Sequence, residues 1–97
     1  MVDQKLKGEG LDELFKAILA LKTVDECYDF FDDLCTRPEL KSFSQRYEVA
    51  ELLLHKTVYS EIVKKTGAST ATISRVNRSL SFGNDGYAMV LKRLKKI

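Results

Sequence analysis

The chain has 97 residues, 44% of them apolar, and a formal net charge of +2, a composition typical of one small globular domain rather than of a disordered or fibrous protein. Its apolar runs are far shorter than the roughly 20 residues that a membrane span needs, and the N-terminus lacks an apolar secretory segment, so the sequence predicts a cytoplasmic protein. Residues 1–36 hold four basic and nine acidic residues, whereas residues 37–97 hold twelve and five. This asymmetry favours a polyanionic partner for the basic part.

Apolar residues recur at intervals of three and four along the first part of the chain, which predicts helices. We expect a flexible tail over residues 1–10 and a single helical domain over residues 11–97. The first helix should run from Leu11 to about Lys22. Thr23 and Glu26 form a capping-box pattern that begins a second helix. Its apolar stripe, which includes Cys27 and Cys35, lies opposite a face of four aspartates: Asp25, Asp29, Asp32 and Asp33.

Two more helices are expected before residue 57. The segment Thr36-Arg-Pro-Glu39 is a second capping pattern, with proline tolerated in the first turn, and it predicts a short helix that ends near Phe43. Ser44 is expected to cap a separate helix that continues to about Lys56.

The stretch from Tyr59 to Arg78 has the pattern of a helix-turn-helix, assigned to residues 57–80. Its first helix should end near Lys65, and Gly67 lies where the turn needs a left-handed residue. Ser69 is a natural N-cap for the second helix, which would bury Ile73, Val76 and Leu80. A loop around residues 81–86 then precedes a last helix over residues 86–97.

The outer face of that second helix is small, hydroxylated and basic. A major groove about 12 Å wide admits a helix whose leading side chains are short, and hydroxyls and arginines can bond to base edges. Residues on the preceding helix are suited to phosphate contacts that set register. The predicted DNA-binding residues are Tyr59, Ser60, Lys64, Lys65, Ser69, Thr70, Ala71, Thr72, Ser74, Arg75 and Arg78. The same glycine and hydroxyl pattern also fits an ordinary helical hairpin that binds no DNA.

Other chemistry has little support in the sequence. The single histidine, His55, has no evident nucleophile partner, so no enzyme activity is expected. The two cysteines lack metal-ligand spacing and are interpreted as buried thiols. The aspartate face is interpreted as solvated, because a hard-metal site would need a turn loop. No metal is predicted.

The segments Gly67-Ala68, Ala71-Thr72-Ile73-Ser74-Arg75 and Ser79-Leu80 resemble, without gaps, the recognition-helix motif of the Trp repressor superfamily, in its Trp-repressor-like YerC/YecD branch. The resemblance runs from about Leu11 to Leu94. It implies an all-α fold of about six helices and an intertwined homodimer formed by residues 11–56, with Phe15, Tyr28 and Phe31 in the dimer core. Two reading heads would then meet successive major grooves.

The same resemblance bears on a ligand. In Trp repressors, tryptophan lies between two arginines beside a glycine. Arg75 matches one arginine, Gln45 stands at the other with Arg46 next to it, and Val76 stands at the glycine position. A β-branched side chain there would fill space that the indole needs, and only half of the stacking pair remains. Tryptophan is therefore disfavoured as a cofactor. Ser79 matches a position near the amino group of the ligand, so these five residues remain a possible pocket for another effector.

We therefore expect a sequence-specific DNA-binding transcriptional regulator, a repressor, which acts as a cytoplasmic homodimer on double-stranded DNA. The alternative is a helix-turn-helix module that binds proteins of the transcription machinery without reading DNA. Loss of DNA association in Arg75→Ala and Arg78→Ala variants would separate the two.

Overall fold

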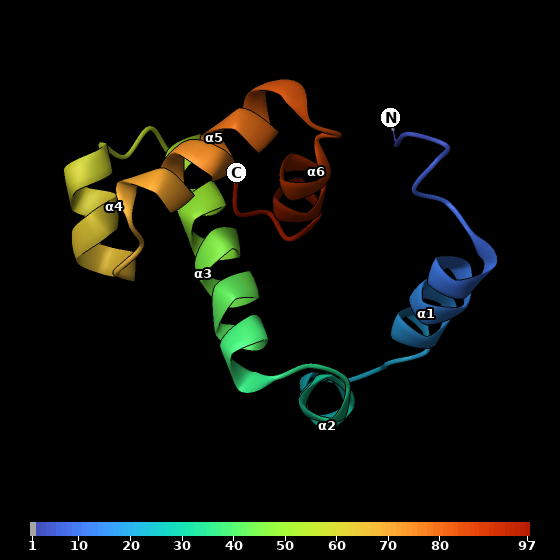
Figure 1. Ribbon diagram of the computed structural model, residues 1–97. Coiled ribbons are helices and arrows are strands. Elements are labelled where there is room, and N and C mark those ends of the chain that lie inside the picture. Colours follow the sequence, from blue (N-terminus) through green and yellow to red (C-terminus); the bar gives the residue numbers. More distant parts are fainter. Residues whose placement is uncertain (1) are drawn as a thin grey trace. The chain divides into compact units, whose positions relative to one another are not determined.

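The structure, a computed structural model, describes residues 2–97 as six α-helices without a β-strand among these residues (Figure 1). The predicted all-α fold of about six helices is confirmed. The helices are α1 (Glu9–Leu19), α2 (Val24–Leu34), α3 (Arg37–Leu54), α4 (Tyr59–Thr66), α5 (Thr70–Phe82) and α6 (Gly86–Arg93).

The chain divides within α3 into two compact units. The N-terminal unit ends at Leu40, and the C-terminal unit comprises Lys41–Ile97. The single domain expected over residues 11–97 stays a prediction beside this division. The physical reason for the division is the distribution of burial, because none of the described residues up to Leu40 is buried, whereas the C-terminal unit encloses a core of its own.

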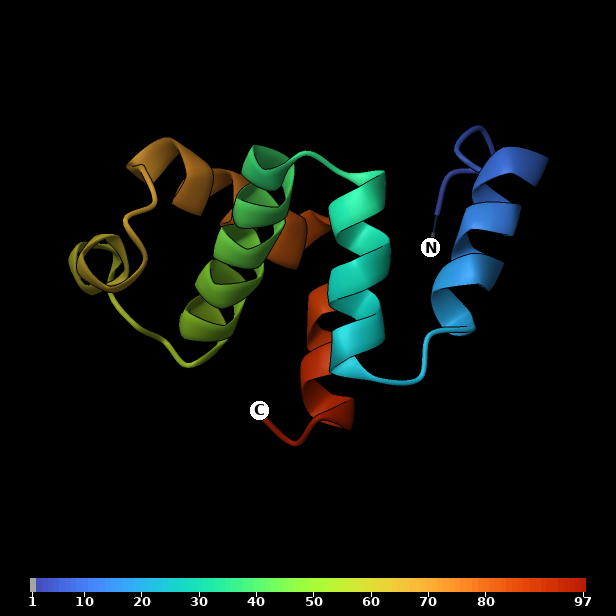
Figure 2. The same ribbon diagram turned by 90° about the horizontal axis from the view of Figure 1, so that it is seen from below.

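The core of the C-terminal unit is made by α3, α4 and α5, which Figure 2 shows together on one side of the unit. Ile62 of α4 and Ile73 of α5 are fully buried and belong to one core cluster, which therefore includes both helices of the helix-turn-helix. Leu91 of α6 is buried as well. The core cluster consists of Val49, Ala50, Ile62, Ala68, Ile73 and Val76, with Leu52, Leu53, Leu80 and Tyr87 packed against it.

The predicted helix starts at residues 23 and 36 are confirmed by their hydrogen bonds. The Glu26 amide donates to Thr23 Oγ1 at 3.1 Å, and the Glu26 carboxylate accepts from the Lys22 amide at 2.8 Å. At the start of α3, the Glu39 amide donates to Thr36 Oγ1 at 3.2 Å and the Thr36 amide donates to Glu39 Oε1 at 2.8 Å. The bonds between Thr36 and Glu39 are reciprocal, as in a capping box, whereas at the start of α2 the carboxylate bonds to the amide of the residue before the cap. In both helices the threonine satisfies an amide that a helix N-terminus otherwise leaves unpaired.

The predicted break at Ser44 is wrong, because α3 runs without interruption through this residue. No glycine or proline occurs between Glu39 and Leu54, and serine inside a helix costs only about 0.5 kcal/mol relative to alanine. Val49 and Ala50, further along the same helix, are fully buried. Their burial outweighs the weak preference of Ser44 for a cap.

Two helix ends also differ from the predictions. The first helix begins at Glu9, so it includes the last two residues of the predicted tail at 1–10; residue 1 lies outside the described residues. The last helix ends at Arg93 rather than at residue 97. Lys95 adopts a left-handed conformation with φ of 57°, and the Lys96 amide donates to the Leu91 carbonyl at 2.8 Å, so the chain turns away from the helix axis.

Candidate nucleic-acid interface

The turn between α4 and α5 is held by its own polar groups. Gly67 has φ of 72°, a left-handed value that costs a glycine almost nothing. Its amide donates to the Val63 carbonyl at 2.9 Å. Thr66 Oγ1 donates to the Ile62 carbonyl at 2.7 Å and accepts from the Ala68 amide at 3.0 Å. Sequence reasoning missed Thr66, although a threonine directly before a turn glycine is a residue that can bond to nearby backbone groups.

Ser69 caps α5 as predicted. Its Oγ accepts from the Thr72 amide at 3.1 Å and donates to Thr72 Oγ1, also at 3.1 Å. These two hydroxyls are therefore partly engaged in holding the helix start, and Thr72 is half-buried. In an interface with DNA, Ser69 and Thr72 would offer mainly the hydroxyl lone pairs that face outward, together with the methyl group of Thr72.

The remaining outer face of α5 is open to solvent. Ile73 and Val76 are 0% and 1% exposed, which confirms the predicted inner face, and Leu80 packs against the core cluster. No ion pair among residues 2–97 involves this face, so its two guanidinium groups are available to a ligand. The exposed residues of the face are Thr70, Ala71, Ser74, Arg75 and Arg78.

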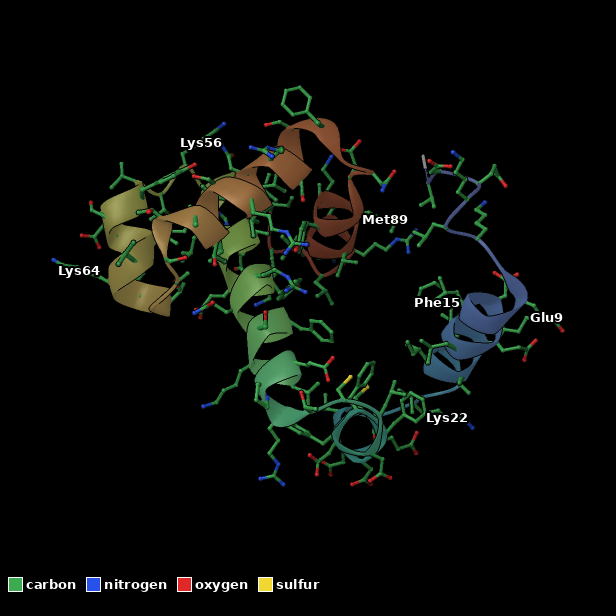
Figure 3. The ribbon with its side chains drawn as sticks, in the orientation of Figure 1. Glu9, Phe15, Lys22, Lys56, Lys64 and Met89 are labelled. Atoms are coloured by element: carbon green, nitrogen blue, oxygen red, sulfur yellow. The ribbon has the colours of Figure 1, made fainter. Side chains whose placement is uncertain are left out.

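The predicted phosphate-contacting residues on α4 are exposed too. Tyr59 is 37% exposed, and Ser60, Lys64 and Lys65 are exposed. Lys64 projects outward from α4 in Figure 3. Both lysines belong to the last turn of the helix, where a positive charge also interacts favourably with the helix dipole.

The five residues of the possible effector pocket have separate roles in the structure. Gln45 Nε2 donates to the Thr66 carbonyl at 3.2 Å, so this side chain also holds the turn. Arg46 donates to Ser42 Oγ at 2.9 Å and lies over the Phe43 ring, 5.2 Å from its centroid. Arg75 is exposed, Val76 is buried, and Ser79 is exposed.

Only Ser79 of those five lines the open pocket between α3, α5 and α6. This pocket has a volume of about 380 Å³ and no charged residue in its lining. Gly83 shapes its wall, because a Cβ there would collide with the Ser79 carbonyl oxygen. The lining residues are Tyr47, Ser79, Gly83, Asn84, Gly86, Tyr87 and Val90.

The cysteines and the aspartates lie mainly on α2. Cys27 is exposed and Cys35 is half-buried, so the prediction of two buried thiols is wrong for the chain by itself. Asp32 accepts from the Arg37 guanidinium. Within residues 2–97, no three histidine, cysteine, aspartate or glutamate side chains gather as a metal site, and no helix is long and apolar enough to cross a membrane.

Comparisons with known proteins agree on one family. Residues 9–95 match the family described as Trp repressor protein. The chain is 56% identical to the uncharacterised protein YerC of Bacillus subtilis (strain 168), over 95% of this chain and 88% of that protein.

Two crystal structures are similar along nearly the whole chain. One is of a candidate Trp repressor from Staphylococcus aureus, with 54% identity and a TM-score of 0.95, covering 100% of this chain and 97% of that one. The other is of a TrpR-like protein from Eubacterium eligens ATCC 27750, with 58% identity and a TM-score of 0.93, covering 96% of each chain.

Proposed function

The chain belongs to the Trp repressor protein family, and from this premise we propose that it is a transcriptional repressor that reads specific double-stranded DNA as a homodimer. The predicted relationship to the YerC branch is confirmed. The fold is that of a family of helix-turn-helix regulators.

The exposed face of α5 carries this proposal. Ala71 and Ser74 are short enough to let the helix backbone approach the floor of a major groove. Arg75 and Arg78 lie one turn apart on the same exposed face, and an arginine can bind guanine through two parallel hydrogen bonds. Thr70 offers a hydroxyl and a methyl group beside them. The opposite face of α5 is committed to the core.

Contacts from α4 supply affinity rather than sequence choice in this proposal. Tyr59 and Ser60 stand at the first turn of α4 and Lys64 and Lys65 at its last turn, so the helix could meet phosphates at both of its ends. Phosphate contacts orient a reading helix without distinguishing bases. They also make binding strongly dependent on salt.

The homodimer is supported by the apolar surface of the N-terminal unit. Phe15 is 54% exposed and Tyr28 is 72% exposed, and large apolar side chains exposed on neighbouring helices mark an interaction surface. A second copy that covers this surface would give the symmetric arrangement that most homo-oligomers adopt. Two reading helices would then face the same side of a DNA duplex.

Tryptophan is not the effector in this proposal. The position that requires a glycine for the indole ring is occupied by Val76, whose side chain belongs to the core. Gln45, at the position of the second arginine, is held by the Thr66 carbonyl. We expect that adding tryptophan leaves the DNA affinity unchanged in an equilibrium binding assay. An increase in affinity of tenfold or more would contradict this part of the proposal.

Selection from random duplex DNA tests the function. The expected result is a two-fold symmetric site whose half-sites lie about 34 Å apart, one helical turn of DNA. Arg75→Ala and Arg78→Ala should each weaken binding to the selected site by about 1–3 kcal/mol. The matched control, Lys16→Gln with Lys22→Gln, removes two positive charges from the N-terminal unit and should leave the sequence preference unchanged.

Failure to recover any motif, with only weak salt-sensitive binding, would overturn sequence-specific reading. A protein complex that forms from cell extract, persists in the Arg75→Ala and Arg78→Ala variants and disappears when α2 is disrupted would support the protein-interaction module instead.

A further inference from the structure

The C-terminal ends of α3 and α6 meet in the C-terminal unit. His55, just after α3, has its Nε2 2.8 Å from the Lys96 carbonyl oxygen, a hydrogen bond across 41 residues of sequence. Figures 1 and 2 both place the C-terminus close to the end of α3. Lys56 follows His55 directly, and Lys95 precedes Lys96. The meeting of these two helix ends therefore brings the segment that holds Lys56 to the segment that holds Lys95 and Lys96.

Two of these lysines adopt a backbone conformation that favours glycine. Lys56 has φ of 64° and Lys95 has φ of 57°. Each ends its helix in the same way, because the amide that follows bonds back to a carbonyl five residues earlier, Thr57 to Leu52 and Lys96 to Leu91. Glycine is the usual residue at such a position, and a side chain there is strained. Lysine therefore stands at two equivalent helix ends where glycine would be free of strain.

None of these three lysines forms an ion pair within residues 2–97. Lys56, Lys95 and Lys96 are all exposed. The ion pairs among residues 2–97 are Lys16 with Glu13 and Arg37 with Asp32, both outside this region. Glu51, one turn before His55, is half-buried and belongs to neither pair.

We propose that Lys56, Lys95 and Lys96, here called the helix-end cluster, form a second contact with the DNA phosphate backbone, beside the helix-turn-helix. The argument rests on the proposed DNA binding. Lys56 is three residues before Tyr59, which begins α4, so the cluster includes a residue close along the chain to the groups assigned to phosphates at that helix end. Lysine carries the compact positive charge that phosphates attract. The cluster contributes affinity and salt dependence but no sequence choice.

The double variant Lys56→Gly/Lys95→Gly tests this inference, because it separates binding from folding. Glycine relieves the left-handed strain, so the urea midpoint of unfolding should stay equal or rise. The plot of log affinity against log salt concentration should become shallower by about two for each bound copy, since each lost phosphate contact removes about 0.9. Lys56→Arg/Lys95→Arg should retain the wild-type slope. The control Lys16→Gln/Lys22→Gln, which removes equal charge elsewhere, should leave the slope unchanged.

An unchanged slope in the glycine variant would overturn the inference, and a lower urea midpoint beside it would assign the lysines to their helix dipoles alone. In that case weakened binding by Arg75→Ala would show that the helix-turn-helix still reads DNA. If the wild-type protein bound no duplex DNA at any salt concentration, the proposed function and the helix-end cluster would both be refuted.

Discussion

The N-terminal and C-terminal units differ in both charge and burial. Residues 1–40 carry five basic and ten acidic residues, whereas residues 41–97 carry eleven and four. The seven buried apolar residues of the described chain all lie in the C-terminal unit. Both units contain amphipathic helices, yet only one buries its apolar side chains within a single chain. The C-terminal unit therefore has its own core, whereas the acidic unit presents an apolar surface that a partner would have to cover.

The largest expected effect is the loss of stability caused by a substitution in the core of the C-terminal unit. Ile73→Ala should lower the free energy of unfolding by about 2–5 kcal/mol, because it deletes a fully buried side chain and leaves a cavity. Urea unfolding followed by circular dichroism measures this change. Ser74→Ala, on the exposed neighbouring residue, is the matched control and should change stability by less than about 0.5 kcal/mol. Equal effects at the two positions would contradict the assignment of the inner face.

The N-terminal unit should respond through association instead. Phe15→Ala combined with Tyr28→Ala removes two exposed aromatic side chains, and should weaken the proposed dimer by about 2–3 kcal/mol, or roughly 30- to 150-fold. Sedimentation across a concentration series measures the dissociation constant. Phe82→Ala, which removes an 87% exposed ring from the C-terminal unit, serves as the control. A wild-type chain that sediments as a monomer at micromolar concentration would eliminate the role given to this surface.

Two glycine-to-alanine substitutions, one in each unit, should change stability in opposite directions. Gly67→Ala forces a side chain into a left-handed turn and should destabilise the C-terminal unit by about 1–2 kcal/mol. Gly10→Ala lies inside α1, where a Cβ would meet nothing within 4 Å, and should stabilise that helix by about 0.5–1 kcal/mol. Thermal unfolding of both variants shows whether each substitution lowers or raises the melting temperature. A stabilising Gly67→Ala would show that the turn tolerates another geometry.

The smallest expected effect is the loss, at low pH, of the stability that the Glu39 carboxylate contributes. The Thr36 amide, and then the Thr36 hydroxyl, hold the pKa of Glu39 below its ordinary value. Because the folded-state pKa is lowered, this stabilisation is present above the unfolded carboxyl pKa of about 4.3 and is lost as pH falls through the folded-state value. The difference in urea midpoint between the wild-type protein and Thr36→Ala should therefore shrink on acidification. A difference that stays constant down to pH 2 would assign the cap to the hydroxyl alone.

Local features of the fold could be predicted because their causes lie within a few residues. Thr23, Thr36 and Ser69 each bond to an amide three residues ahead, and this spacing is visible in the sequence. Gly67 ends α4 in the left-handed conformation, and this too is a local effect, because glycine is the usual residue at such a helix end. The buried face of α5 followed from a 100° rotation per residue, which Ile73 and Val76 obey.

Predictions failed where distant contacts decide. Ser44 has the local preference of a cap, but burial of later residues on α3 keeps the helix continuous. Cys27 lies on an apolar stripe and is nevertheless exposed, because a stripe predicts which face can be covered and not whether the same chain covers it. The candidate DNA-binding residues lie on the predicted faces, and their contacts with DNA stay a prediction.

Local sequence is therefore enough to predict the helical class, the capped helix starts, the glycine turn and the composition of the outer face of α5, since each depends on neighbours within one or two turns. Packing of the helices settles instead which apolar faces are buried within one chain, that Gln45 bonds to the Thr66 carbonyl, and that His55 at the end of α3 bonds to the Lys96 carbonyl just after α6. These features join residues that are 21 and 41 positions apart, and contacts of that range depend on how the helices pack rather than on local periodicity.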